Sequence, residues 1–211
     1  ALYDNTTGAG NIAVGNTALA NNTIGNLNTA VGYQALNINV NANKNVAIGS
    51  YALLNATRAS SIDTYNVAIG YEAAKTLTAG ETNIAIGGQA LFSNTTASAN
   101  VAVGYQALYD NTTGASNVAV GGDALANNTT ASSNTAIGTS ASYDITTGLR
   151  NTSIGHRAGR NLSTGSDNIS IGYQAYPTAF TSDGQCTLGN TSITNLRCND
   201  TTISSLSDAR D

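Results

Sequence analysis

The chain has 211 residues and a formal net charge of −4, and only 9% of its residues are charged. It has no Trp or Met and two Phe, so its buried side chains must be mainly Ala, Val, Ile and some Leu. Its eight Lys and Arg form no basic run, which argues against binding to nucleic acid. No apolar run approaches the ~20 residues that span a bilayer, so no membrane insertion is expected.

A nine-residue stretch at 100–108 recurs along the whole chain. Copies of its glycine, called here the corner glycine, stand at Gly15, Gly32, Gly49, Gly70, Gly87, Gly104, Gly121, Gly138, Gly155 and Gly172, with a degenerate copy at Gly189. Successive glycines are 17 residues apart, except for a step of 21 after Gly49. A short fixed period indicates a solenoid, so we predict an all-β parallel β-solenoid of about 17-residue coils over residues 1–189. Residues 1–8 repeat residues 107–114, so we expect the chain to be part of a longer protein.

Each coil contains a short alternating segment before its corner glycine. The residues three and one before the glycine are β-branched in most coils, and the residue between them is Ala or Ser. This alternation predicts a strand of about four residues, with Val and Ile on one face and Ala on the other. We expect Ala on the outer face, where another chain would have to cover it. After the glycine we expect a second short strand and then a polar turn.

Two positions of the repeat have structural interpretations. The corner glycine, as at Gly49 and Gly104, fits a turn that needs positive φ and close backbone approach. The asparagine four residues earlier, as at Asn45 and Asn100, recurs in ten coils. We expect its stacked amides to bond along the axis and to the turn backbone.

The segment Asn-Val-Ala-Ile-Gly-x-x-Ala at 45–52 and 66–73 resembles the head repeat of trimeric autotransporter adhesins. That resemblance implies a left-handed parallel β-roll in a homotrimer whose chains are intertwined or side by side. The period here is longer than in that family, so the turns must differ. The segment Asn-Thr-Ala-Val-Gly-Tyr-Gln-Ala-Leu at 28–36 is also similar to arrays in phage tail fibres.

The C-terminal residues favour the tail fibre. The repeat loosens into a short connector, expected to be β-rich, over residues 190–207. The ending Leu-Ser-Asp-Ala-Arg-Asp at 206–211 resembles the junction with an endosialidase-type intramolecular chaperone. That resemblance implies cleavage between Ser207 and Asp208, with residues 208–211 beginning the chaperone domain. A plain polar linker is the alternative interpretation of this ending.

No arrangement of catalytic residues, metal ligands or cofactor-binding residues is recognisable, so we expect no enzyme activity and no cofactor. His156, the only histidine, follows a corner glycine and is expected to be an exposed substitution. Asp110, Asp144 and Asp167 are expected to be solvated caps in turns. Cys186 and Cys198 are predicted to be reduced, with Cys186 as a small core residue.

Two columns of side chains bear on function. In the first, a tyrosine follows the corner glycine and is itself followed by Gln or Glu. The tyrosines are Tyr33, Tyr71, Tyr105 and Tyr173, and their followers are Gln34, Glu72, Gln106 and Gln174. An outward ring beside an amide can stack on a sugar, but these tyrosines can equally cover an edge of the roll or a seam between subunits. The second column is Thr7, Thr96, Thr113, Thr130, Thr147, Thr164 and Thr181.

These features lead to three hypotheses. The first is an extracellular, trimeric segment of a virion tail fibre that contacts a glycan or protein receptor on the host surface. The second is the head of a trimeric adhesin on a bacterial cell surface. The third, suggested by the threonine column, is an ice-binding or other monomeric β-solenoid.

Overall fold

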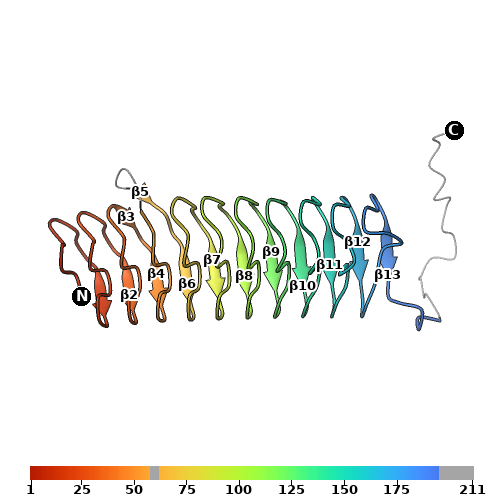
Figure 1. The fold of residues 1–211 in the computed structure, drawn as a ribbon, viewed down its shortest axis with the longest axis horizontal. Coiled ribbons are helices and arrows are strands. Elements are labelled where there is room, and N and C mark those ends of the chain that lie inside the picture. Colours follow the sequence, from red (N-terminus) through yellow and green to blue (C-terminus); the bar gives the residue numbers. More distant parts are fainter. Residues whose placement is uncertain (58–61, 195–211) are drawn as a thin grey trace.

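A computed structural model describes residues 1–57 and 62–194 as a rod of stacked coils (Figure 1). Most of the predicted connector, the Ser207–Asp208 junction and Cys198 lie outside the described residues. The strands are β1 (Ile12–Val14), β2 (Thr29–Val31), β3 (Ala42–Asn43), β4 (Val46–Ile48), β5 (Ile62–Asp63), β6 (Val67–Ile69), β7 (Ile84–Ile86), β8 (Val101–Val103), β9 (Val118–Val120), β10 (Thr135–Ile137), β11 (Thr152–Ile154), β12 (Ile169–Ile171) and β13 (Cys186–Leu188).

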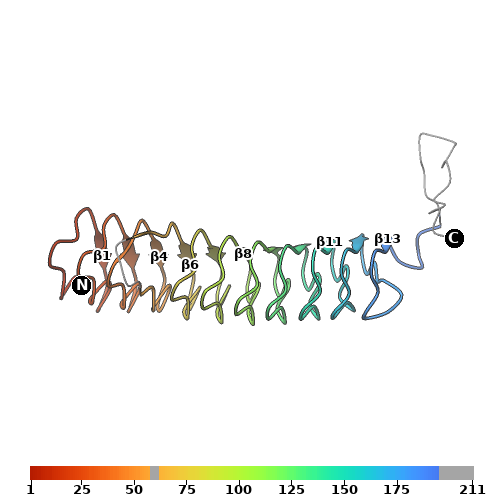
Figure 2. The same ribbon diagram turned by 90° about the horizontal axis from the view of Figure 1, so that it is seen from above.

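Eleven of these strands form one parallel sheet along a single side of the rod (Figure 2). Each strand pairs only with the strands of the preceding and following coils, and equivalent residues face each other, as Val101 and Val118 do. The register continues across the 21-residue step, where Val46 pairs with Val67. Near this step, β3 and β5 form a small separate parallel pair. The predicted all-β parallel solenoid with a repeat of about 17 residues is confirmed.

The expectation that Ala faces outward is wrong. The central alanines of β2, β4 and β6–β10 are fully buried, as are Ser153 and Ser170 in β11 and β12. The β-branched residues on either side of them are half-buried or exposed. The coil is narrow, and the strand lies opposite buried residues such as Ala107 and Leu108 from the return turn. Only a small side chain fits between these two layers, so the larger Val and Ile side chains face outward.

The expected second strand is also absent from the described coils. The second and fourth residues after the corner glycine adopt left-handed backbone conformations, as in Gln106 (φ 54°) and Leu108 (φ 53°). Left-handed residues cannot continue an extended strand. They direct the two amides along the axis in opposite senses, because Gln106 N–H donates to Gly88 O and Leu108 N–H donates to Ala124 O, both at 3.0 Å. The return segment is therefore a chain of turns bonded to both neighbouring coils.

The corner glycines and the asparagine column have the predicted structural roles. From Gly15 to Gly172 the corner glycines have φ between 113° and 140°. Asn100 Oδ1 accepts the backbone N–H of Asn117 at 2.9 Å, and Asn100 Nδ2 donates to Gly114 O at 3.0 Å. Asn45 Oδ1 likewise accepts the N–H of Asn66 at 3.0 Å. These side chains are buried and tie each strand to the next coil and to its own turn.

Candidate functional site

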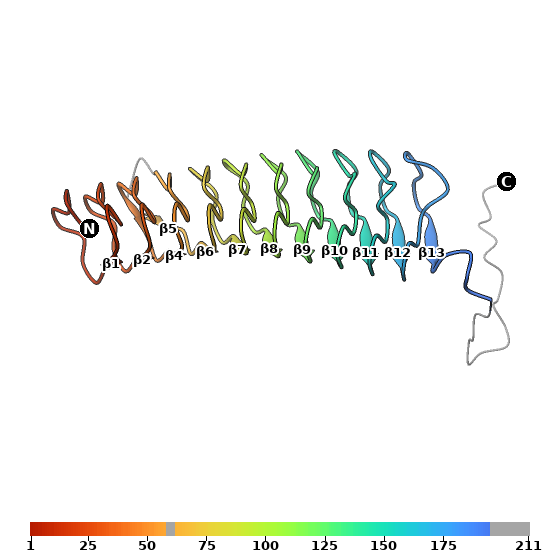
Figure 3. The ribbon, with the colours of Figure 1, turned by 60° about the horizontal axis from the view of Figure 1, so that its bottom comes forward.

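The outward residues of the long sheet form an apolar strip, called here the sheet column. It consists of the residues three and one before each corner glycine. The exposed members are between 36% and 58% accessible: Ile12, Val14, Ile48, Ile84, Ile86, Ile137, Ile154, Ile169, Ile171 and Leu188. Figure 3 shows their strands following one another along the rod. Its members other than Val, Ile and Leu are Thr29, Thr135, Thr152 and Cys186. An apolar strip of this length is unusual on an isolated chain and is typical of an interaction surface.

The residues directly after the corner glycines form a second outward column, called here the tyrosine column. All four predicted tyrosines are exposed, from 43% for Tyr33 to 60% for Tyr105. They are not stacked on one another, because they stand in coils that are not adjacent. Tyr51, one position further along in the third coil, contacts Tyr33 and Tyr71 edge-on, with ring centroids 5.2 and 6.3 Å away.

The other two tyrosines differ in their surroundings. Tyr173 stacks on the exposed His156, with ring centroids 5.6 Å apart and planes 10° apart. Tyr105 has no ring partner among the described residues. A Cβ built at Gly88 would meet Tyr105 Cδ2 at 3.5 Å, so the Tyr105 ring lies beside the bare backbone of Gly88.

A row of amide and carboxylate groups runs beside these tyrosines, one residue further along each coil. Gln106 Nε2 donates to Gln89 Oε1, and Gln89 Nε2 donates to Glu72 Oε2, both at 3.0 Å. Gln34 Nε2 instead donates to the hydroxyl of Tyr33 at 3.2 Å. Gln89 does not belong to a Tyr-Gln pair, because Gly88 precedes it. Its position two residues after the corner glycine Gly87 nevertheless identifies it as a member of this row.

Glu72 ends this row in a charged and aromatic cluster. Lys75 Nζ lies 2.6 Å from Glu72 Oε1, and its ammonium lies 5.3 and 5.5 Å from the ring centres of Tyr51 and Phe92. The hydrogen bond from Lys75, and then that from Gln89, lower the pKa of Glu72. Burial raises the pKa of the Tyr51 hydroxyl. The cluster holds Glu72 ionised and fixes the end of the amide row.

Two further ion pairs bridge adjacent coils. Arg150 makes a bidentate contact with Asp167, at 2.6 and 2.8 Å, so Asp167 is exposed, as expected from the sequence, but is also paired with a cation. Asp63 lies 2.6 Å from Lys44 Nζ and accepts the Tyr65 hydroxyl at 3.1 Å. In both pairs the hydrogen bond from the cation lowers the pKa of the carboxyl group.

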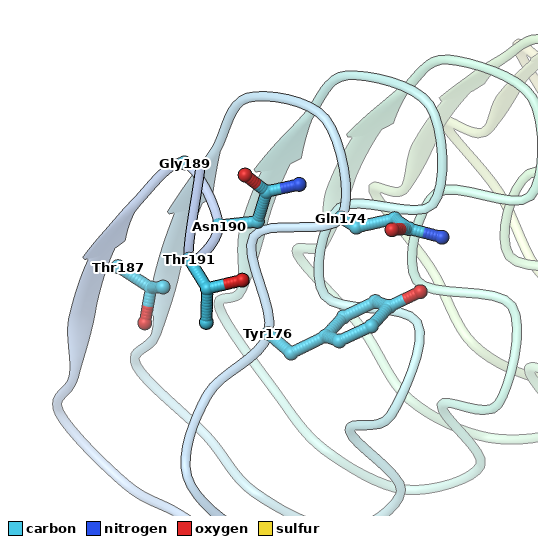
Figure 4. A pocket seen from close by; sticks show the side chains of 6 residues that line it. All are labelled: Gln174, Tyr176, Thr187, Gly189, Asn190 and Thr191. Atoms are coloured by element: carbon cyan, nitrogen blue, oxygen red, sulfur yellow. The ribbon is translucent and has the colours of Figure 1, made fainter. Parts of the chain in front are cut away.

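A pocket of about 460 Å³ lies at the C-terminal end of the stack. Its lining residues are Gln174, Tyr176, Thr187, Gly189, Asn190 and Thr191 (Figure 4). Tyr176 occupies the position held by a core leucine in most earlier coils, and it is 39% exposed. Gln174, one of the predicted glycan contacts, therefore lines this pocket rather than the amide row of Glu72, Gln89 and Gln106.

The remaining candidates are readily placed. Cys186 is a free thiol, but it pairs in register with Ile169 on the outward face and is exposed, so its predicted burial is wrong. The seven threonines of the predicted column are exposed at a turn. Residues 1–57 and 62–194 contain no group of three His, Cys, Asp or Glu side chains that could hold a metal ion. The same ranges contain no helix long and apolar enough to cross a membrane.

The chain matches no protein-family model, no curated protein and no solved structure.

Proposed function

We propose that the chain is a receptor-facing segment of a phage tail fibre: a homotrimeric rod of left-handed β-rolls, carried on the outside of the virion, that contacts a glycan on the host surface. The observation that carries this proposal is the pair of outward columns on one rigid stack. The sheet column supplies a seam between chains, and the tyrosine column supplies a surface for the receptor. The role requires no catalysis and no cofactor.

The sheet column supports assembly. Covering the Val and Ile side chains would stabilise an assembly by roughly 25 cal/mol for each Å² of apolar surface removed from water. Equivalent residues lie at the same level in every chain, so three parallel copies could bring their strips together around one axis. Of the surfaces described above, this is the one whose composition most resembles an interface core.

The tyrosine column supports receptor contact. Its rings are exposed, and side-chain amides held by hydrogen bonds lie beside them. An aromatic face with fixed donors and acceptors suits a sugar, whose C–H face is apolar and whose edge carries hydroxyl groups. A protein receptor is the alternative partner.

A test of the glycan contact uses the full-length protein and bacterial envelopes bearing different surface polysaccharides. We expect attachment to at least one envelope, and we expect replacement of Tyr71, Tyr105 and Tyr173 by Ala to weaken it while the trimer stays intact. Unchanged attachment of that variant would leave the tyrosines as packing groups. Mass spectrometry of the same protein tests for cleavage between Ser207 and Asp208, which the resemblance of residues 206–211 to a chaperone junction implies.

Two other functions have specific support. An adhesin head on a bacterial surface would use the same rod and seam, and the sequence that follows residue 211 distinguishes it from a tail fibre. An ice-binding solenoid is favoured by the exposed threonines Thr96, Thr113 and Thr130, whose hydroxyls make no hydrogen bond within the described residues. Their neighbours, such as Thr112, instead bond to the carbonyl of the next coil, at 2.9 Å from Thr129 O. Sedimentation equilibrium and thermal hysteresis separate this monomeric function from the first two.

A further inference from the structure

The tyrosine column has a two-coil period in the middle of the rod. From the coil of β6 to that of β9, the residue after the corner glycine is Tyr71, Gly88, Tyr105 and Gly122 in turn. Coils are stacked at the strand spacing of ~4.8 Å, so Tyr71 and Tyr105 recur at roughly 10 Å along the axis. Gly88 leaves room for the Tyr105 ring, and Gly122 keeps the surface beyond that ring low. A Cβ at Gly122 would meet only the carbonyl oxygen of Tyr105, at 4.0 Å.

Polar groups on this surface are fixed before any ligand binds. Glu72, Gln89 and Gln106 form a continuous hydrogen-bonded row beside the two rings, and Lys75 anchors its end. Each glutamine uses part of its hydrogen-bonding capacity within the row and retains the rest for a ligand. Groups held in place lose little entropy on binding, which favours recognition of a repeating polar ligand.

The charge of this surface excludes some ligands. The two positions after the corner glycine in these four coils include Glu72 and Asp123 but no Lys or Arg. Within residues 66–134, which form these coils, Lys75 is the only Lys or Arg, and it is paired with Glu72 at 2.6 Å. A polyanionic polysaccharide would therefore find no compensating charge, and a neutral one is favoured.

We infer that this surface binds an extended, neutral β-1,4-linked polysaccharide that runs parallel to the rod axis, with Tyr71 and Tyr105 stacked on every second sugar ring. In an extended β-1,4-linked chain each ring is turned by about half a revolution relative to the last, so the same ring face returns at every second sugar. Two such sugars advance by nearly the distance between two coils. The inference rests on the proposed glycan-binding role and specifies the linkage and the direction of the ligand.

Tyr33 and Tyr173 do not share this arrangement. Tyr33 is packed against the Tyr51 ring, and Tyr173 is stacked on His156. The Tyr71 ring meets the Tyr51 ring only edge-on, with centroids 6.3 Å apart, and Tyr105 is the most exposed of the four tyrosines. The paired surface of Tyr71 and Tyr105 is therefore the centre of the site.

Calorimetry with the full-length protein and soluble hexasaccharides tests the inference. The probes are β-1,4-linked chito- and cello-hexaose, with α-1,4-linked malto-hexaose and β-1,3-linked laminari-hexaose as linkage controls. We expect binding of the β-1,4-linked probes, and a loss of about tenfold in affinity for Tyr71→Ala or Tyr105→Ala. Tyr3→Ala, which removes an exposed tyrosine at the N-terminal end of the rod, should leave the affinity unchanged.

A variant of identical composition tests the spacing. Gly88→Tyr combined with Tyr105→Gly keeps two rings but places them one coil apart, and we expect it to bind as weakly as Tyr105→Ala. Undiminished binding by this variant, or equal binding of the linkage controls, would overturn the inference. Tyrosine-dependent attachment to envelopes without any preference for β-1,4 linkage would overturn it while leaving the proposed function in place. Tyrosine-independent attachment would overturn the glycan contact itself.

Discussion

Each corner glycine sits where the backbones of two coils approach most closely. Gly104 has φ of 140°, and a Cβ added there would lie 2.4 Å from the carbonyl oxygen of Gly121. An alanine at this position would have a strained backbone conformation and would clash with the next coil unless the strand left its register. The glycine column therefore sets the coil spacing in addition to turning the chain.

A matched pair of substitutions tests this role. We expect Gly104→Ala to lower the free energy of unfolding by about 3 kcal/mol or more, because strain and a backbone clash add together. Gly122→Ala, one residue after a corner glycine in the next coil, would meet only the carbonyl oxygen of Tyr105, at 4.0 Å, and should change it by less than about 0.5 kcal/mol. Denaturant unfolding of the two variants measures the difference. Equal effects would show that the corner does not require glycine.

Glu72 provides a pH-dependent contribution to stability. Its folded pKa lies below the usual 4.5, because Lys75 and Gln89 donate hydrogen bonds to its ionised form. Its stabilisation should therefore be complete above that usual value and be lost as the pH falls through the lowered folded pKa. We expect the stability difference between wild type and Glu72→Gln to shrink as the pH falls from about 7 to about 3. A difference that stays constant over this range would contradict the assignment.

At the scale of the coil, one large aliphatic side chain fills the interior from either of two positions. Five of the ten coils from Gly15 to Gly172 place Leu at the fourth residue after the corner glycine and Asn at the seventh, as in Leu108 and Asn111. Where the fourth residue is small, the seventh is aliphatic, as in Ala74 with Leu77 and Ser142 with Ile145. The interior volume is conserved although the position of the leucine is not.

Where the asparagine at the seventh position is replaced in the next coil, a buried polar atom is left without a partner. Asn128 Nδ2 donates to Asn111 Oδ1 at 2.8 Å, but Asn128 Oδ1 has no hydrogen-bond partner, since the equivalent residue of the next coil is Ile145. Asn39 Oδ1 is unpaired for the same reason, because Ala56 follows it. Each run of stacked asparagines therefore ends in an unsatisfied acceptor, at a cost of about 1–3 kcal/mol.

A double-mutant cycle tests the exchange. We expect Leu108→Ala alone to cost about 2–5 kcal/mol, because it leaves a cavity. Asn111→Leu alone should cost about 1–3 kcal/mol through overpacking. Together they reproduce the arrangement of Ala74 and Leu77, so the double variant should lie within about 1.5 kcal/mol of wild type. Additive losses in denaturant unfolding would show that the two positions are independent.

The repeat was predictable from the sequence because period and register follow from spacing alone. The corner glycines and the asparagine column were predictable for the same reason. The inward face was not, because both faces of the strand are apolar and the larger residue is usually the buried one. Here the narrow coil reverses that preference, and Cys186 was misplaced together with Ile169. The positive φ of Leu108 was equally unpredictable, because Leu rarely adopts this conformation and only the stacking of the coils enforces it.

The charged and aromatic part of the candidate site depends on contacts between coils that the motif does not encode. Lys75 reaches Glu72 within one coil but reaches Phe92 across a coil boundary. Tyr51 stands one position further along its coil than Tyr33 and Tyr71 do in theirs, yet its ring contacts both of theirs. Neither arrangement follows from the Tyr-Gln motif alone.

At the scale of the whole molecule, the sheet column determines how copies would meet. If it is the seam of the proposed trimer, a charge in its middle would be buried without a partner. We expect Val103→Lys to give monomers by sedimentation equilibrium with an unchanged far-ultraviolet circular dichroism spectrum. Thr113→Lys, an exposed substitution on a turn, should leave the trimer intact. Trimers of Val103→Lys would exclude the sheet column as the seam.

The same regularity makes the alignment of the copies ambiguous. A slip of one coil still places β-branched residues against β-branched residues and glycine against glycine, so ten of eleven coils would keep equivalent neighbours. The difference in free energy between aligned and slipped trimers is then small compared with the barrier to separating them. We expect residues 1–211 alone to give mixed or aggregated assemblies, and a trimeric coiled coil fused after Asp211 to give uniform trimers by sedimentation. Uniform trimers without the fusion would show that the rod aligns itself, with the 21-residue step as the one irregular mark. A soluble monomer at micromolar concentration would exclude the trimer.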